Sequence, residues 1–92
     1  MTHETAPADR QAELFDLLSD ETRIAILREL SSAERSGEAP VSFTDLAQRT
    51  QSGDTGRFNY HLRRLRARLI DKQAGGYVLS EEGRSVAPLI AP

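Results

Sequence analysis

One segment of the chain, residues 55–69, restricts the possible folds more than any other. Its apolar side chains Phe58, Leu62, Leu65 and Leu69 stand at intervals of four, three and four residues. At about 100° per residue in a helix, these positions fall within a stripe roughly 60° wide. The opposite side of the same helix carries Gly56, Asn59, Tyr60, Arg63, Arg64 and Ala67. The segment therefore predicts a helix with one narrow side in a core and a polar, arginine-rich side outside.

Weaker patterns surround this segment and complete the expected order of elements. Apolar residues at helical spacing predict further helices over residues 9–18, 20–33 and 43–51, and a last helix from residue 81. Short strands are expected at 70–73 and 77–79, joined by a hairpin turn at Ala74-Gly75-Gly76, where the paired glycines accept positive φ angles. Residues 41–43 could form a very short strand. The prediction is a mainly α fold with a small β-hairpin, a winged helix-turn-helix in the order α-α-β-α-α-β-β-α.

Side chains that can cap a helix stand where the later helices are expected to begin. In chain order they are Ser19, Ser42, Asp54 and Ser80. An oxygen at this position accepts a hydrogen bond from a free amide of the first turn. Pro88 and Pro92 are expected to limit the last helix, because proline lacks the backbone N–H that a helix uses.

Composition limits the chain to one small domain. Of its 92 residues, 1–8 are polar and contain a proline, so we expect a frayed tail followed by one folded domain over 9–92. No apolar run approaches the roughly 20 residues of a membrane span. The polar start lacks the layout of a secretory signal, which predicts a cytoplasmic location. Because the chain has no cysteine, disulfides and thiolate metal sites are excluded.

The charge of the chain is divided unevenly along it. The net charge is −2 overall, but residues 57–72 hold five arginines and one lysine against the single acid Asp71. An acidic protein with one basic stripe suits a polyanion that docks on one face. An arginine-rich helix that is merely solvated would show the same pattern.

The polar side of residues 55–69 is typical of a helix that enters the major groove of double-stranded DNA. The residues expected to reach base edges are Thr55, Gly56, Arg57, Asn59, Tyr60, Arg63 and Arg64. Those expected to contact the DNA backbone or to belong to the wing at 70–79 are Ser42, Thr44, Arg66, Arg68, Lys72, Gln73, Gly75 and Gly76. The alternative is a winged-helix module of the transcription machinery that binds another protein, with Tyr60 packed on that partner.

Three stretches of the chain resemble ArsR-type winged-helix repressors, and their archaeal-type subset in particular. They are the run Leu18-Ser-Asp-Glu-Thr-Arg-Ile-Ala-Ile-Leu-Arg-Glu-Leu30, the run Asn59-Tyr60-His61-Leu62-Arg63-Arg64-Leu65, and the run Leu79-Ser80-Glu81-Glu82-Gly83. Together they span residues 18–83. The resemblance implies transcription regulation by a homodimer that places two recognition helices in successive major grooves.

The resemblance also implies where two copies would meet. Its first and last helices would form the two-fold interface, which here offers the apolar residues Leu14, Phe15, Leu17, Leu89 and Ile90. The chain departs from the family in two respects. It has neither the cysteines nor the last-helix histidines of the metal sensors, so no metal and no cofactor are expected. Arg68 stands where the family usually has glycine, and it could take a phosphate contact.

Nothing in the chain predicts catalysis. Glu81 and Glu82 fall in the first turn of a helix, where attraction to the helix dipole explains them. His61 lies about 60° from the apolar stripe, where a structural role or a phosphate contact is expected. No Ser-His-Asp order, glycine-rich phosphate loop or cluster of metal ligands is visible. The chain is therefore expected not to be an enzyme.

Overall fold

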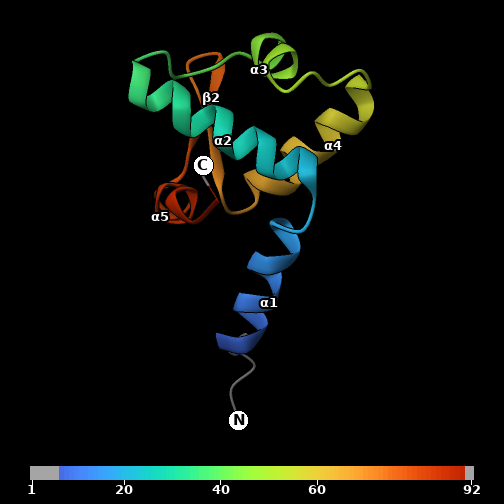
Figure 1. Ribbon diagram of the computed structural model, residues 1–92, viewed down its shortest axis with the longest axis vertical. Helices are drawn as coiled ribbons and strands as arrows, with labels where there is room; N and C mark the ends of the chain where they lie inside the picture. Colours follow the sequence, from blue (N-terminus) through green and yellow to red (C-terminus); the bar gives the residue numbers. More distant parts are fainter. Residues whose placement is uncertain (1–6, 91–92) are drawn as a thin grey trace.

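Within the residues that the computed structural model describes, 7–90, five helices and one hairpin follow one another in the predicted order (Figure 1). They are α1 (Pro7–Leu17), α2 (Glu21–Ser36), α3 (Phe43–Arg49), α4 (Thr55–Arg66), β1 (Ile70–Gln73), β2 (Gly76–Leu79) and α5 (Glu81–Ile90). The very short strand considered for residues 41–43 is reduced to one antiparallel bridge between Val41 and Tyr77. The fold class is therefore confirmed: mainly helical, with a two-stranded hairpin in a winged-helix-like arrangement.

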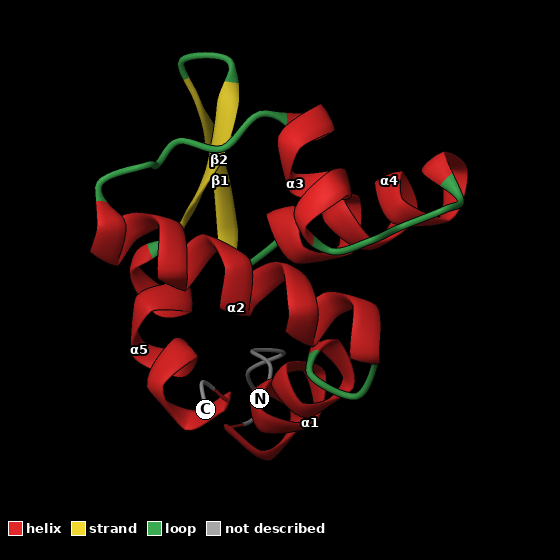
Figure 2. Ribbon diagram, turned by 45° about the horizontal axis from the view of Figure 1, so that its top comes forward, coloured by secondary structure: helices red, strands yellow, loops and turns green. Residues whose placement is uncertain are grey.

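Helix α2 forms the centre of the core. It crosses the middle of the molecule, with α4 and α5 packed against it (Figure 2). Its Ile26, Leu27 and Leu30 are fully buried and meet the stripe of α4, where Phe58 and Leu65 are equally inaccessible. Full burial of one such side chain contributes about 1.5–3 kcal/mol. The narrow apolar side predicted for α4 is thus the side that holds it to the domain.

The hairpin packs on the core through β2 and through the first residue of β1, Ile70. Ile70 pairs with Leu79 and Gln73 with Gly76, and all four residues of β2 are buried while β1 is exposed beyond Ile70. The positive φ angles of the turn fall on Ala74 (41°) and Gly75 (81°), not on the two glycines as predicted. A two-residue turn of this kind needs positive φ at both central positions. Gly76 instead begins β2.

The stretch from Leu79 to Gly83 joins the hairpin to α5 through a close approach of two backbones. The Ser80 hydroxyl donates to the Arg68 carbonyl at 2.9 Å and accepts from the Gly83 amide at 2.9 Å, which caps α5 as predicted. A Cβ on Gly83 would lie 2.1 Å from the Leu69 carbonyl oxygen. Only glycine fits there, so this motif fixes where α5 starts.

Helix caps agree with the sequence at three of the four predicted positions. Besides Ser80, Ser42 accepts from the Asp45 amide and Asp54 from the Arg57 amide. The prediction was wrong for α2, where Asp20 is the cap. Its carboxylate accepts from two amides of the first turn, at 2.8 and 3.3 Å. Ser19 instead donates to the Asp16 carbonyl and ends α1.

Several helix ends differ from the prediction for local reasons. Helix α2 continues to Ser36 and stops at Gly37, whose φ of 77° is left-handed. Helix α3 is shorter than predicted because Gln51 has a φ of 56°, and α4 gives way to turns after Arg66. Helix α5 passes through Pro88, which lies in its last turn and removes only one backbone hydrogen bond.

Helix α1 extends away from the other elements (Figure 1). With α1 included, the molecule measures 46 Å along its longest axis and 27 Å along each of the other two. It begins at Pro7, so the predicted tail was too long by two residues. Residues 1–6 of that tail, and Pro92, lie outside the described residues. Only the end of the helix enters the core, through the buried Leu17.

Candidate nucleic-acid interface

The first three residues of α4 are exposed at the surface of the domain. Asp54 begins the helix by accepting from the Arg57 amide at 3.0 Å. Thr55, Gly56 and Arg57 are all exposed. A Cβ on Gly56 would approach only the Asp54 carboxylate, at 3.6 Å. This end of the helix can therefore come close to another surface.

The middle of α4 continues the same exposed side. Tyr60 is 52 % exposed, Arg63 and Arg66 are exposed, and Asn59 is half-buried. The helix holds four arginines and no acidic residue. Its outer side therefore combines positive charge with hydrogen-bond donors, as the sequence predicted.

Arg64 is partly drawn away from this side. Its guanidinium forms an ion pair with Asp16 of α1 and donates to the Tyr60 hydroxyl at 3.3 Å. Hydrogen bonds to Tyr60 and Asp16 raise the pKa of the guanidinium further above its usual value. Arg64 thus connects α4 to α1, and only part of its side chain is exposed on the outer side of the helix.

Arg68 is bonded to side-chain and backbone groups of α5 and α1, and its predicted contact with DNA is therefore not proposed further. Its guanidinium lies 2.7 Å from Glu82 and donates to the Arg10 carbonyl at 2.9 Å, with Glu13 at 4.0 Å. The hydrogen bond to Glu82 raises the pKa of Arg68. Because the side chain is only 22 % exposed and bonded to α1 and α5, it joins these helices and does not face outward.

The hairpin places its charged residues at the outer strand. Lys72 and Gln73 of β1 are exposed, and the Lys72 ammonium lies 5.8 Å from the centre of the Tyr77 ring. Gly75 is exposed at the tip. Gly76 is buried, and a Cβ there would meet Pro40 at 2.9 Å and the Val41 backbone at 3.0 Å. Its assignment to the wing surface was therefore wrong, because it packs against the chain before α3.

The predicted contacts at α3 lie at its start. Ser42 and Thr44 are exposed. The Ser42 hydroxyl accepts from the Asp45 amide at 3.1 Å, and its O–H remains available as a hydrogen-bond donor. Both residues can contribute to an outer surface without rearrangement of the core.

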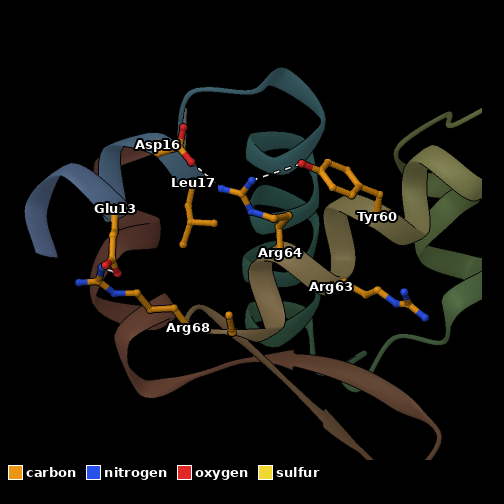
Figure 3. A pocket seen from close by; sticks show the side chains of 8 residues that line it. Glu13, Asp16, Leu17, Tyr60, Arg63, Arg64 and Arg68 are labelled. Atoms are coloured by element: carbon orange, nitrogen blue, oxygen red, sulfur yellow. Dashed lines mark hydrogen bonds and ion pairs between the residues drawn. The ribbon is translucent and has the colours of Figure 1, made fainter. Parts of the chain in front are cut away.

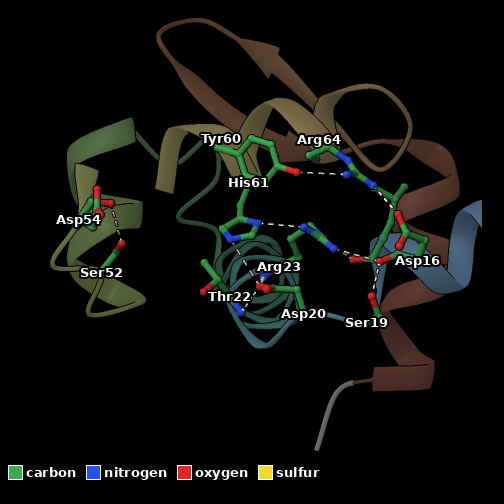
Figure 4. Close-up of polar contacts among 11 residues, drawn as sticks. Asp16, Ser19, Asp20, Thr22, Arg23, Ser52, Asp54, Tyr60, His61 and Arg64 are labelled. Atoms are coloured by element: carbon green, nitrogen blue, oxygen red, sulfur yellow. Dashed lines mark hydrogen bonds and ion pairs between the residues drawn. The ribbon is translucent and has the colours of Figure 1, made fainter. Parts of the chain in front are cut away.

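A buried polar network below α4 was missed by the sequence analysis (Figure 4). Arg23 of α2 is only 6 % exposed and donates to the Leu17 carbonyl at 2.8 Å and the Asp16 carbonyl at 3.0 Å. Its third contact is Nδ1 of His61, at 2.9 Å. The network therefore joins the end of α1 to α2 and α4. A signal was present, because Arg23 stands on the same helical stripe as the core residues 26, 27 and 30.

Of the two roles expected for His61, a structural role or a phosphate contact, its buried position fits the structural one. Because Arg23 donates to Nδ1, we assign the imidazole proton to Nε2, which lies 3.6 Å from the Asp20 carboxylate. Burial lowers the pKa of His61 below its ordinary 6.5. The negative charge of Asp20 acts to raise this pKa, whereas the positive charges of Arg23 on α2 and of two arginines on α4 lower it further. Burial acts to raise the pKa of Asp20, but hydrogen bonds from two backbone amides and nearby positive charges lower it.

The predicted interface residues near the two ends of the chain divide into two groups. Phe15 is 67 % exposed and Leu89 is 79 % exposed. Leu14 and Ile90 are half-buried against the core. Leu17 is buried within its own copy, because it anchors α1, and its assignment to a contact between copies was wrong.

Residues 7–90 contain neither a cluster of metal ligands nor a helix suited to cross a membrane. No three histidine, aspartate or glutamate side chains in this range come together as metal ligands would. None of the described helices has the length and apolar character needed to cross a membrane.

Together, the fold and this surface define a small winged-helix-like protein whose α4 presents an arginine-rich outer side. Residues 11–90 match the family described as a domain of unknown function, DUF7347, and the chain belongs to this family. No match was found among curated proteins or among solved structures.

Proposed function

We propose that the chain is a cytoplasmic, ArsR-like transcription regulator that binds double-stranded DNA sequence-specifically as a homodimer. Helix α4 would enter the major groove, and the hairpin would lie on the flanking groove or backbone. The ArsR-like part of the proposal rests on the three motifs of the resemblance, which lie in and around α2, in α4 and at the junction before α5.

The observation that carries the proposal is the exposed outer side of α4. Arg57 and Arg63 are exposed on a helix whose start is free of bulk at Gly56. An arginine can bond a guanine with two hydrogen bonds, and an asparagine such as Asn59 can bond an adenine in the same way.

The surroundings of α4 support the same use. Lys72, Gln73 and Arg66 are exposed, as are Ser42 and Thr44 at the start of α3. These side chains suit phosphate contacts, which position a domain on DNA without reading its sequence. Arg68 and Gly76 are left out of the proposed surface for the reasons given above.

The homodimer is proposed from exposed apolar side chains. Phe15 on α1 and Leu89 on α5 are large and mostly exposed, which is unfavourable in an isolated copy. Both would be buried if α1 and α5 of two copies met. Sedimentation of the wild type and of a Phe15→Glu, Leu89→Glu double variant tests this directly: we expect a dimer and a monomer, respectively.

The DNA proposal is tested by selecting duplexes from a random pool and measuring affinity over a range of salt concentrations. We expect one enriched sequence family with a two-fold repeat. Affinity should fall steeply with salt, with a log–log slope of about −0.9 per phosphate contacted. A protein that binds no duplex even at low salt would contradict the proposal and would favour a protein-binding module instead.

A further inference from the structure

A groove of about 560 Å³ lies between α1 and α4 (Figure 3). Its walls are mainly apolar, and Leu17 points into the space between Arg64 and Arg68. Ala67 adds a small side chain on the side of α4, and Tyr60 lies at one end. Volumes of about 300–1,000 Å³ with apolar walls are typical of sites that enclose small molecules.

Among the described residues, three arginines line the groove and three carboxylates face them, but the ion pairs leave one of these arginines without an acidic partner. Arg64 is paired with Asp16 at one end, and Arg68 is paired with Glu82 while it also faces Glu13 at the other. Within residues 7–90, the remaining lining arginine, Arg63, forms no ion pair with an acidic side chain. Its exposed side chain lies at one edge of the groove and points away from Leu17 (Figure 3).

We propose that this groove binds a small apolar molecule with a single negative charge, such as an aromatic carboxylate. The apolar body would cover Leu17 and Ala67 beside the Tyr60 ring. Arg63 would swing to the rim and donate two parallel hydrogen bonds to the carboxylate, which its planar guanidinium suits. A neutral molecule would leave Arg63 unused, and the carboxylates of Glu13 and Asp16 in the same lining would repel a second negative charge.

The same groove would link this ligand to DNA. This second step rests on the proposed function, because Arg63 and Tyr60 are also residues proposed to read bases. A bound carboxylate would occupy Arg63 and cover Tyr60, so ligand and DNA would exclude one another. The molecule would therefore act as an inducer that releases the protein from its operator.

The site is tested by titrating the isotopically labelled protein with naphthoate and with its uncharged counterpart naphthamide, followed by NMR. We expect amide shifts confined to residues 13–17 and 60–68. Naphthoate should bind about tenfold more tightly than naphthamide, because one charge-assisted pair is added. Equal affinity for the two probes, or shifts centred on Phe15 and Leu89 alone, would overturn the proposal.

Two variants and one control locate the contacts. Arg63→Gln should remove the preference for naphthoate, and Ala67→Phe should block both probes by filling the groove. Arg66→Gln changes an exposed arginine on the same helix outside the groove, so its preference should equal that of the wild type. Circular dichroism verifies that each variant is folded. If Arg63→Gln and Arg66→Gln behave alike, the assignment of Arg63 is wrong.

Competition with DNA is measured separately on a selected duplex. At a naphthoate concentration ten times its Kd, the apparent Kd for DNA should rise about tenfold. If naphthoate binds but DNA affinity is unchanged, the inducer role is overturned while the binding site stands. If no duplex is bound at all, the proposed function fails, and the NMR titration still decides the groove.

Discussion

The arginines of α4 and of the turn after it fall into two groups with opposite relations to the rest of the domain. Arg57, Arg63 and Arg66 are exposed, and none of them forms an ion pair with an acidic side chain in the described part of the chain. Arg64 and the nearby Arg68 are paired with acids of α1 and α5. The comparison teaches that a basic stripe in a sequence is not one surface. Part of it is available to a partner, and part of it holds helices together.

The largest expected effect is a loss of DNA affinity on removal of the exposed arginines of α4. A double variant, Arg57→Ala with Arg63→Ala, should weaken binding to a selected duplex about a thousandfold, since each arginine contact with a base is worth about 1–3 kcal/mol. Fluorescence anisotropy measures the affinity. The free energy of unfolding of the double variant should differ from that of the wild type by less than about 0.5 kcal/mol.

The control for this experiment is Arg35→Ala. Arg35 is an exposed arginine near the end of α2, beside β2 and α5. Its removal should leave DNA affinity nearly unchanged. Equal losses in the double variant and in Arg35→Ala would show that the exposed arginines of α4 have no special part in binding.

The buried side of α4 should respond in the opposite manner. Arg23→Met would leave two backbone carbonyls of α1 and Nδ1 of His61 without their donor. We expect the free energy of unfolding to fall by about 3 kcal/mol in urea denaturation. His61→Gln keeps an acceptor for Arg23 and should cost clearly less. A stable Arg23→Met protein would mean that the network is dispensable.

A matched pair at the end of α4 sharpens the comparison further. Arg68→Met should lower the free energy of unfolding by about 1–2 kcal/mol, because it breaks a partly buried ion pair with Glu82. Arg66→Met, two residues earlier and exposed, should change it by less than about 0.5 kcal/mol. For DNA the order should reverse, with the salt dependence reduced only in Arg66→Met. The comparison fails if Arg68→Met weakens DNA binding without loss of stability.

The smallest expected effect is a pH dependence of stability. The pKa of His61 in the folded protein lies below its ordinary 6.5, so the unfolded chain binds more protons between these two values. Stability should therefore be complete above about pH 6.5 and fall as the pH is lowered through this window. Urea denaturation between pH 7 and 5.5 measures the slope. This window lies above the ordinary pKa of the carboxylates, and His61→Gln should have a flatter profile; an identical slope would assign the effect to another group.

Much of the fold could be predicted because its determinants are local. The stripe Phe58, Leu62 and Leu65 follows from helical periodicity alone, and Asp54 and Ser80 cap helices through contacts three residues along the chain. The cap of α2 was assigned one residue too early because Ser19 and Asp20 are both good caps. No local rule separates them, and Ser19 turned out to end α1.

The candidate site was harder to predict because its members are defined by distant partners. Arg64 meets Asp16 across 48 positions of the chain, and Arg23 meets His61 across 38. The sequence could mark Arg63 and Arg64 only as two arginines on one side of a helix. Which of them is free depends on where α1 lies.

By itself, the sequence determined the order of the elements, the buried side of α4 and the identity of most helix caps. These depend on interactions within a few residues, which any copy of the same stretch would form. Only the tertiary structure decided which arginines stay exposed, that Gly76 packs inside and that Leu17 anchors α1. The reason is physical: an ion pair or a close packing contact exists only when the chain brings both partners within a few ångströms, and spacing along one helix does not encode that distance.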